Sequence, residues 1–494
     1  MLKFFKNFLI LSLSTGIINI IEVITNAYIT QKIGTTVLGS YSLIMNVFNF
    51  LVTISLFGVP LAITKIVSEK DELNDKPSIV KASKIGYKLC ALISISVCIF
   101  TIIFKEKISK IFLNNLDDTR ILILLALSLP LMALSSCICG YFNALRKVEK
   151  PVINEFLSHV VRSFIIVTLI YLKKPTYLSF GISILLSEFI SFMYSYTMYK
   201  RDIKRYIFLR KSIKDNTLAL TKDVLRISAP ISFTSFVRSG LSTLKHTLIP
   251  LRLQKFGFSY DYALSRYGLI HGIALPFVLM PSIFINCFSS LLLPEYSRFF
   301  ATNNTLKIKS ITDKIFKFTI LASLYISFIL YISSDLLCYS IYKNSEVSYY
   351  VKILTPLICI IYLDYIVDNI LRGLDLQVKV MKINIIDVII SILIIYLGVP
   401  YLGTFGYILV IYTSEYLNGI LSINLLLKKI NMDFKYLEWI FIPVCFMFIS
   451  YYLTTNLITK VENILSMTLS ILIFSTIFIF LYLTFNIAIK KIRR

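Results

Sequence analysis

Long apolar stretches alternate with short polar segments along the whole chain. Fourteen of these stretches approach the roughly 20 apolar residues that a helix needs to cross a bilayer core about 30 Å thick. They cover residues 8–30, 41–63, 86–104, 121–142, 152–171, 177–198, 227–251, 269–293, 316–332, 351–371, 383–397, 402–426, 437–453 and 464–487. The pattern predicts an all-α polytopic membrane protein with about 14 transmembrane helices.

Short sequence matches recur in the same order in the two halves of the chain. Each pair is separated by 221 to 227 residues: QKIG at Gly34 and QKFG at Gly257, YSLI at Tyr41 and YGLI at Tyr267, Pro60 and Pro281, Pro130 and Pro356, SEF at Ser187 and SEY at Ser414. A nearly constant offset indicates a duplication. Because six helices return the chain to the same side, the two halves are predicted to form parallel six-helix lobes.

This duplication predicts the domain organisation. An N-terminal six-helix lobe covers residues 1–199, and a basic cytoplasmic linker covers 200–222. A second six-helix lobe covers 223–429, and two further helices cover 430–494.

Polar side chains line one face of the first and seventh predicted helices at spacings of three and four residues. In the first helix they are Ser12, Thr15, Asn19, Glu22 and Asn26, and in the seventh Ser228, Ser232, Ser235, Ser239, Ser242 and His246. One interpretation is helix packing through small hydroxyl side chains. The other is a water-filled cavity between the halves, which the equivalent positions of the two stripes favour. Glu22 and Lys245 would then give the cavity walls opposite charges.

Other ionisable residues also lie inside predicted helices. A charge at mid-membrane costs about 2.5–3.5 kcal/mol, so such a residue normally has a structural or functional role. Glu155, His159 and Arg162 share one face of the fifth helix, which indicates either a proton relay or an internally compensated polar face. Asp364 and Asp368 lie one turn apart in the tenth helix. An arginine one turn further on predicts an ion pair for Asp368.

Composition supports the membrane assignment and excludes other classes. Hydrophobic residues make up 57% of the 494 residues, and mean hydropathy is +0.78. The net charge of +24 comes mostly from alternate loops, which predicts a cytoplasmic-membrane protein with both termini in the cytoplasm rather than a nucleic-acid partner. No glycine-rich phosphate loop, HExxH or His/Cys metal spacing occurs, so we expect no catalytic residues, no metal site, no cofactor and no enzyme activity.

Two segments resemble a known family. They are SRYGLIHGIALPFVLMPSIFINCFSSLLLPEYSRF, from Ser265 to Phe299, and QKIGTTVLGSYSL followed by GVPLAITKIVSE, between Gln31 and Glu69. They are similar to the stage V sporulation protein B family, in the polysaccharide-exporter branch of the multidrug, oligosaccharidyl-lipid and polysaccharide flippase superfamily, and to lipid II flippases.

The resemblance implies two lobes that alternate between inward and outward openings. It implies a flippase for a lipid-linked oligosaccharide or peptidoglycan precursor of the undecaprenyl-pyrophosphate type, used for the spore cortex. It also implies that the last two helices hold the lipid tail. Membrane lipids and cell-wall synthesis proteins are the expected partners.

Site residues follow from this resemblance and from the polar stripes. The cavity cations expected to bind the pyrophosphate are Arg238, Lys245, Arg266 and Lys32. The residues expected to serve gating or coupling are Glu22, Asn26, His246 and Asp364, with Na⁺ or H⁺ as the coupling ion. Relatives often carry a basic residue in the first helix, where this chain has Thr25 and Asn26. A cation-coupled multidrug exporter and a non-transporting assembly factor in sporulation are the alternatives.

Overall fold

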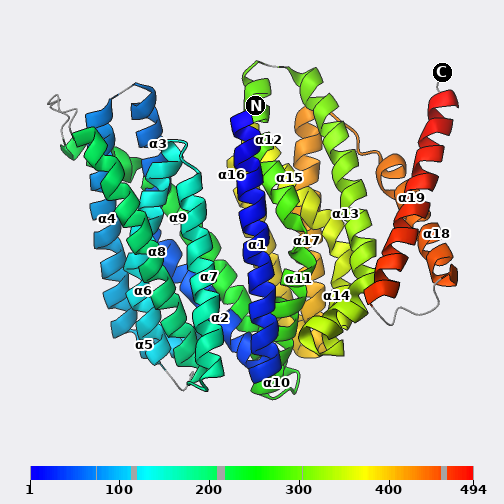
Figure 1. Cartoon of the computed structure of the whole chain (residues 1–494), viewed down its shortest axis with the longest axis horizontal. Helices are drawn as coiled ribbons and strands as arrows, with labels where there is room; N and C mark the ends of the chain where they lie inside the picture. The colour runs from blue at the N-terminus through cyan, green and yellow to red at the C-terminus, as the bar shows by residue number, and fades with distance from the viewer. Residues whose placement is uncertain are drawn as a thin grey trace. The chain divides into compact units, whose positions relative to one another are not determined.

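The computed structural model describes residues 2–73, 75–112, 119–207, 217–302, 304–457 and 464–492, and within these ranges the chain is helical and contains no strand (Figure 1). Among these residues, twelve helices or helix pairs are long and apolar enough to cross a membrane. These are α1 (Leu2–Ile33), α2 (Thr35–Leu56), α4 (Lys76–Ile103), α6 (Arg120–Ala144), α7 (Glu149–Tyr171), α8 (Thr176–Ile207), α13 (Thr305–Tyr342), α14 with α15 (Ser345–Leu354 and Ile358–Gly373), α16 (Gln377–Leu397), α17 (Val399–Ile430), α18 (Ile442–Leu457) and α19 (Ile464–Ile492). The predicted polytopic all-α fold is confirmed.

Two further regions account for the remaining predicted spans. One is a bent pair, in which α10 (Tyr260–Tyr267) and α11 (Leu275–Leu279) meet α12 (Ser282–Ala301) at 64°. The other is α9 (Thr217–Lys255), whose 39 residues extend roughly 58 Å. α9 contains the predicted seventh helix. It is not among the twelve apolar spans because it carries the polar stripe and several charged residues.

The predicted continuous helices over 41–63 and 269–293 are wrong, because both are broken in the structure. α2 ends at Leu56 and α3 (Val59–Glu72) begins after Gly58, with Pro60 in its first turn. α11 ends at Leu279 and α12 begins after Pro281. The breaks fall at the paired prolines of the repeat, since proline cannot donate the hydrogen bond that continues a helix.

The repeated glycine of the QKxG segments ends a helix in both halves. Gly34 follows α1 with a φ of 100°, and Gly257 follows α9 with a φ of 113°. Both N–H groups bond back into the preceding helix, to the carbonyl oxygens of Thr30 (3.0 Å) and Gln254 (2.9 Å). Residues with a Cβ rarely adopt this backbone conformation, so the turn explains the repeated glycine.

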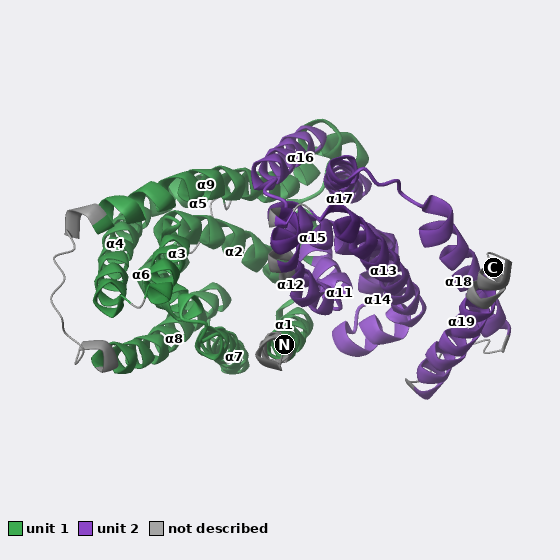
Figure 2. Cartoon of the chain, turned by 90° about the horizontal axis from the view of Figure 1, so that it is seen from above, with its two compact units in different colours: residues 1–268, 395–403 green, residues 269–394, 404–494 purple. Residues whose placement is uncertain are grey.

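Contacts group the helices into two compact units (Figure 2). Unit 1 contains residues 1–268 and 395–403, and unit 2 contains residues 269–394 and 404–494. α9 and α10 therefore belong with the N-terminal helices, because they pack on α2. The predicted domain ranges were drawn from the sequence repeat and not from contacts between helices, so they stay a prediction.

The packing of α10 on α2 brings two backbones into direct contact. A Cβ added to Gly39 of α2 would lie 2.1 Å from the carbonyl oxygen of Leu264, and one added to Gly268 would lie 2.4 Å from that of Thr35. The hydroxyls of Thr35 and Ser265 are 2.6 Å apart beside this crossing. Small residues that admit such close approach are typical of helix packing in membranes.

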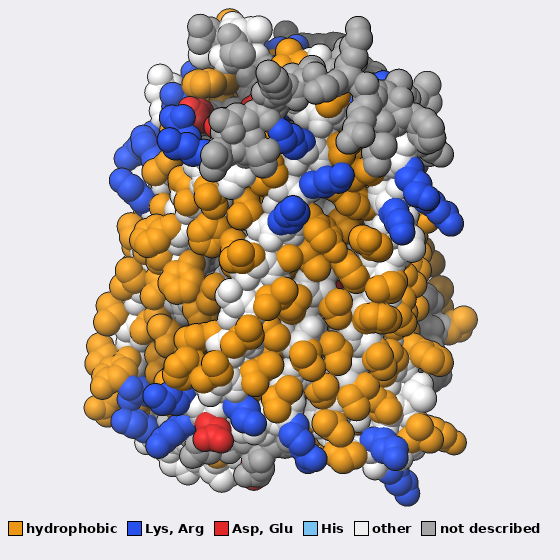
Figure 3. Space-filling view, turned by 90° about the vertical axis from the view of Figure 1, so that its left-hand side faces the viewer, with side chains coloured by type: hydrophobic (Ala, Val, Ile, Leu, Met, Phe, Trp, Pro, Cys, Tyr) orange, Lys and Arg blue, Asp and Glu red, His pale blue; other side chains and the backbone are white. Residues whose placement is uncertain are grey.

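The surface fits a bilayer. On the face in Figure 3, hydrophobic side chains form a broad belt between an upper and a lower rim of Lys and Arg. The twelve apolar spans and this belt identify a multi-pass membrane protein.

The α2–α10 crossing generates a stability prediction. Gly39→Ala places a methyl group against a backbone carbonyl and should lower the free energy of unfolding by about 1–3 kcal/mol, measured by thermal unfolding of the purified protein in detergent. Gly16→Ala in α1 is the matched control, because nothing lies within 4 Å of its added Cβ. The control should be neutral or stabilising by up to about 1 kcal/mol. Equal effects of the two substitutions would contradict the close crossing.

Candidate functional site

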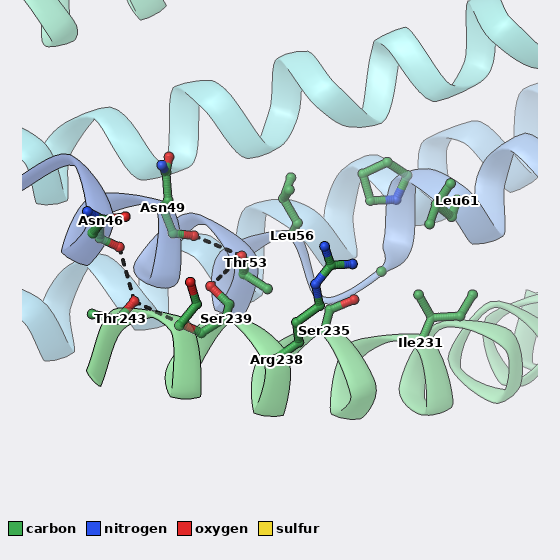
Figure 4. A pocket seen from close by; sticks show the side chains of 13 residues that line it. Asn46, Asn49, Thr53, Leu56, Leu61, Ile231, Ser235, Arg238, Ser239 and Thr243 are labelled. Atoms are coloured by element: carbon green, nitrogen blue, oxygen red, sulfur yellow. Dashed lines mark hydrogen bonds between the residues drawn. The ribbon is translucent and has the colours of Figure 1, made fainter. Parts of the chain in front are cut away.

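A polar groove of about 470 Å³ lies within unit 1, between α9 and the junction of α2 with α3 (Figure 4). Its lining is Asn46, Asn49, Thr53, Leu56, Gly58, Pro60 and Leu61 on one side and Ile231, Ser235, Arg238, Ser239, Ser242 and Thr243 on the other. Amides, hydroxyls and one guanidinium make up the polar part of this lining. No carboxylate is among these residues.

The serine stripe of α9 serves two purposes along its length. Ser228 and Ser232 pack where α2 ends, and a Cβ on Gly58 would lie 2.9 Å from the Ser228 carbonyl oxygen. Ser235, Ser239 and Ser242 line the groove further along the helix. The stripe therefore packs at one end and lines a groove within unit 1 in the middle, whereas the predicted cavity between the two halves stays a prediction.

Hydrogen bonds hold the groove walls together. The Thr53 hydroxyl donates to Ser239 Oγ at 3.3 Å, and the Thr243 hydroxyl donates to the Asn46 carbonyl oxygen at 3.2 Å. These bonds link α2 to α9 and fix the positions of the polar side chains between them.

A series of side chains in contact connects the groove to His246, one of the predicted gating residues. Asn46 Nδ2 donates to the Tyr267 hydroxyl at 3.1 Å, and this hydroxyl lies 3.2 Å from His246 Nδ1. His246 therefore contacts the groove wall through Tyr267 rather than lining the groove itself.

Arg238 is the predicted cation that the structure places in the groove. It is exposed, and in Figure 4 it extends from α9 towards the side of the groove formed by Leu56. Within the described part of the chain, no hydrogen bond or ion pair engages its guanidinium. A guanidinium in this setting can bind a phosphate through two parallel hydrogen bonds.

The three other predicted cations lie outside the groove lining. Lys245 is half-buried on α9, beyond the groove residues. Arg266 lies against the ring of Tyr262, with 4.6 Å between the guanidinium carbon and the ring centroid, and donates to its hydroxyl. Lys32 is exposed in the last turn of α1.

The remaining gating candidates lie on α1 and α15. The Glu22 carboxylate lies 2.8 Å from His159 Nδ1, and Asn26 is half-buried one turn further along α1. In unit 2, Asp364 Oδ1 is buried and has no hydrogen-bond partner among the described residues. The predicted ion pair of Asp368 with Arg372 is confirmed at 3.6 Å.

The α2 side of the groove was missed at the sequence level. Asn46, Asn49 and Thr53 are spaced by three and four residues, the spacing that identified the stripes of the first and seventh helices. This shorter stripe was the available signal. The groove contains no metal-ligand cluster, and no group of three or more His, Cys, Asp or Glu in the described ranges could hold a metal ion.

Comparisons with known proteins agree with this architecture. The chain is 23% identical over 452 residues to stage V sporulation protein B of Bacillus subtilis, covering 88% of this chain and 86% of that protein. The structure superposes on lipid II flippase MurJ in an inward closed conformation with a TM-score of 0.73, at 15% identity, over 98% of this chain and all of that one. An inward-facing multidrug resistance MATE family transporter of the MOP superfamily gives a TM-score of 0.64 at 11% identity, over 84% and 94% of the two chains.

The structural likenesses establish a fold shared with these transporters. The model of the family described as polysaccharide biosynthesis protein matches residues 4–300, which contain α2 to α11, nearly all of α1 and α12, and the complete groove. The chain therefore belongs to the polysaccharide biosynthesis protein family.

Proposed function

We propose that this protein is a flippase that moves the anionic headgroup of a lipid-linked oligosaccharide or peptidoglycan precursor across the cytoplasmic membrane by alternating access. The observation that carries the proposal is Arg238, a cation without an ion-pair partner in the described chain, in a groove of amides and hydroxyls. The solved structure named as a lipid II flippase, whose fold this chain shares, supports the same substrate class.

The groove has the chemistry that such a headgroup requires. A polyprenyl pyrophosphate carries negative charge that hydrocarbon excludes, and the Arg238 guanidinium supplies the opposite charge. Asn46, Asn49 and Thr53 offer donors and acceptors for sugar hydroxyls. The volume of about 470 Å³ lies within the usual range for a small-molecule site.

The lipid tail is proposed to lie against α18 and α19. In unit 2, Tyr325 of α13 stacks with Phe474 and Phe478 of α19, with ring centroids 6.1 and 5.9 Å apart. Around this stack α18 and α19 leave large apolar side chains exposed, among them Phe448 (59%) and Phe480 (67%). An aromatic and aliphatic surface of this kind suits a prenyl chain that stays in the bilayer.

We propose coupling to a cation, Na⁺ or H⁺, with Asp364 as a participant. Its buried Oδ1 has no hydrogen-bond partner within the described residues, and Asp368 and Glu415 are its carboxylate neighbours. A buried carboxylate in this setting favours binding of a cation.

A cation-coupled multidrug exporter is the second candidate, since the fold is shared with a MATE family transporter. The lining of the groove disfavours an organic cation, because it carries Arg238 and no carboxylate. A non-transporting assembly factor in sporulation is the third candidate, and the variants below separate it from the other two.

The relative named as stage V sporulation protein B supports a role in sporulation. We propose that the protein acts in spore cortex synthesis, in the cytoplasmic membrane of an endospore-forming bacterium, beside cell-wall synthesis proteins. Both termini are proposed to be cytoplasmic, because most Lys and Arg lie in the loops on that side.

Arg238→Gln tests the proposed headgroup site. Translocation of undecaprenyl-linked peptidoglycan precursor should fall about tenfold or more, because a hydrogen bond to a charged group contributes about 1.5–3 kcal/mol. The measurement is the leaflet distribution of this precursor in sporulating cells, with protein abundance checked by immunoblot.

Arg226→Gln is the matched control, because Arg226 is an exposed arginine on the same helix that does not line the groove. It should leave the distribution near that of the native protein. A normal precursor distribution in cells lacking the protein, together with a defective cortex, would refute the flippase and favour the assembly factor.

Reporter fusions test the proposed orientation. A fusion partner active only in the cytoplasm should be active after Arg494 and within the linker 200–222, and a periplasm-specific partner should be inactive at both places. Opposite activities at the two positions would contradict an even number of spans between them.

A further inference from the structure

Four charged side chains form two linked pairs across α1, α7 and α8 of unit 1. His159 Nδ1 lies 2.8 Å from Glu22 Oε1, which joins α7 to α1. One turn along α7, Arg162 Nη2 lies 2.9 Å from Glu188 Oε1 of α8, and the Ser158 hydroxyl donates to the same oxygen at 3.0 Å. All four charges lie in helices that qualify as membrane spans.

The two pairs differ in how far the protein encloses them. The side chains of Arg162 and Glu188 are 14% and 5% exposed, so this pair lies inside the helix bundle. The side chains of His159 and Glu22 are 24% and 47% exposed, so the protein leaves this pair partly uncovered. In the pair of Arg162 and Glu188, the arginine is permanently charged. The pair of His159 and Glu22 contains an imidazole, a group that ordinarily titrates between pH 5 and 8.

The charge count of the cluster depends on one proton. Glu22 and Glu188 supply two negative charges and Arg162 supplies one positive charge. These four side chains sum to zero charge when His159 is protonated and to one negative charge when His159 is neutral. Glu155 lies outside the two pairs and adds a further negative charge in both cases. An uncompensated charge inside a membrane is unfavourable, so the cluster is built to hold one exchangeable proton.

The neighbouring groups supply no second cation. Tyr41 of α2 lies near Arg162 and Glu22, and Cys139 of α6 lies near Glu155 and Glu188. Glu155, one turn before His159 on α7, adds another carboxylate rather than a positive charge. Within the described residues, no further Lys or Arg forms an ion pair with Glu22 or Glu188.

We propose that Glu22 and His159 form a proton-binding site that fastens α1 to α7. The proton comes from bulk water and adds to the imidazole, which then pairs with the Glu22 carboxylate. When the proton leaves, Glu22 keeps its charge without a cation beside it, and the attachment of α1 to α7 weakens. The site needs no substrate and goes beyond the proposed function, so its test is independent of transport.

The three histidines of the chain make a direct titration feasible. The experiment is NMR of the purified full-length protein, labelled with ¹³C at the histidine rings, between pH 5 and 9 in nanodiscs. His159→Gln assigns the His159 signal by its loss. His246, which contacts the Tyr267 hydroxyl, is the internal reference.

Two substitutions with opposite expected signs test the charge count. Glu22→Gln removes the paired carboxylate and should weaken proton binding at His159 about tenfold, because an opposite charge at this distance favours the protonated ring. Arg162→Gln removes the competing cation and should strengthen proton binding. The His246 signal should not move in either variant. Glu22→Asp should restore much of the affinity that Glu22→Gln loses.

Several outcomes would overturn the proposal. One is a His159 signal that does not titrate between pH 5 and 9. Another is a titration that Glu22→Gln leaves unchanged, which tests the pair even if Arg162→Gln fails to fold. A third is a midpoint that falls when sodium chloride replaces choline chloride at constant ionic strength, which would assign the site to a metal cation instead of a proton.

Discussion

A polar side chain in a hydrocarbon layer must find a partner within the protein or face water, and the organisation of this molecule follows from that constraint. Most Ser and Thr hydroxyls meet it locally, as when Ser94 donates to the Cys90 carbonyl oxygen one turn back at 2.6 Å. Charged side chains meet it with ion pairs, along one helix as in Asp368 with Arg372, or across helices as in Arg162 with Glu188. Arg238 instead lies along a polar groove. This placement leaves its charge available to a ligand.

The groove also depends on breaks and close approaches in the helices around it. α2 stops at Leu56 because Phe57 and Gly58 adopt left-handed backbone conformations, with φ of 45° and 62°. α3 then starts in a new direction, and the residues at this junction form one end of the groove. At its other end Asn46 bonds to Tyr267 of α10, and α10 is held on α2 by the glycine crossing. The contact of α2 with α10 thereby fixes the position of α2, and with it where the polar side chains of α2 meet those of α9.

The helical fold was predictable because its signal is local. Apolar length and a spacing of three to four residues identify each span and its polar face without knowledge of the neighbours. The breaks at Pro60 and Pro281 were not predicted, although the repeat paired these prolines, because proline is tolerated in membrane helices when neighbours satisfy the freed backbone groups. Arg238 was predicted as a cation of a cavity between the halves, and the structure places it in a groove within unit 1. The partner of Glu22 was not predictable, since the stripe defines a face of α1 but not the helix that meets it, and His159 lies 137 residues further along the chain.

A physical link connects the proton site to the groove through the backbone. α1 passes into α2 through the single residue Gly34, so a displacement of α1 at this end acts directly on the start of α2. The first turns of α2 are the part held on α10 by Thr35 and Gly39. An α1 that is fastened at Glu22 therefore constrains the helix that supplies Asn46, Asn49 and Thr53 to the groove. The second half has the same order of elements, because Gly257, also with a positive φ, lies between α9 and α10, and α9 supplies Arg238 to the opposite wall. Each wall of the groove therefore includes a helix that begins or ends within two residues of a repeated glycine.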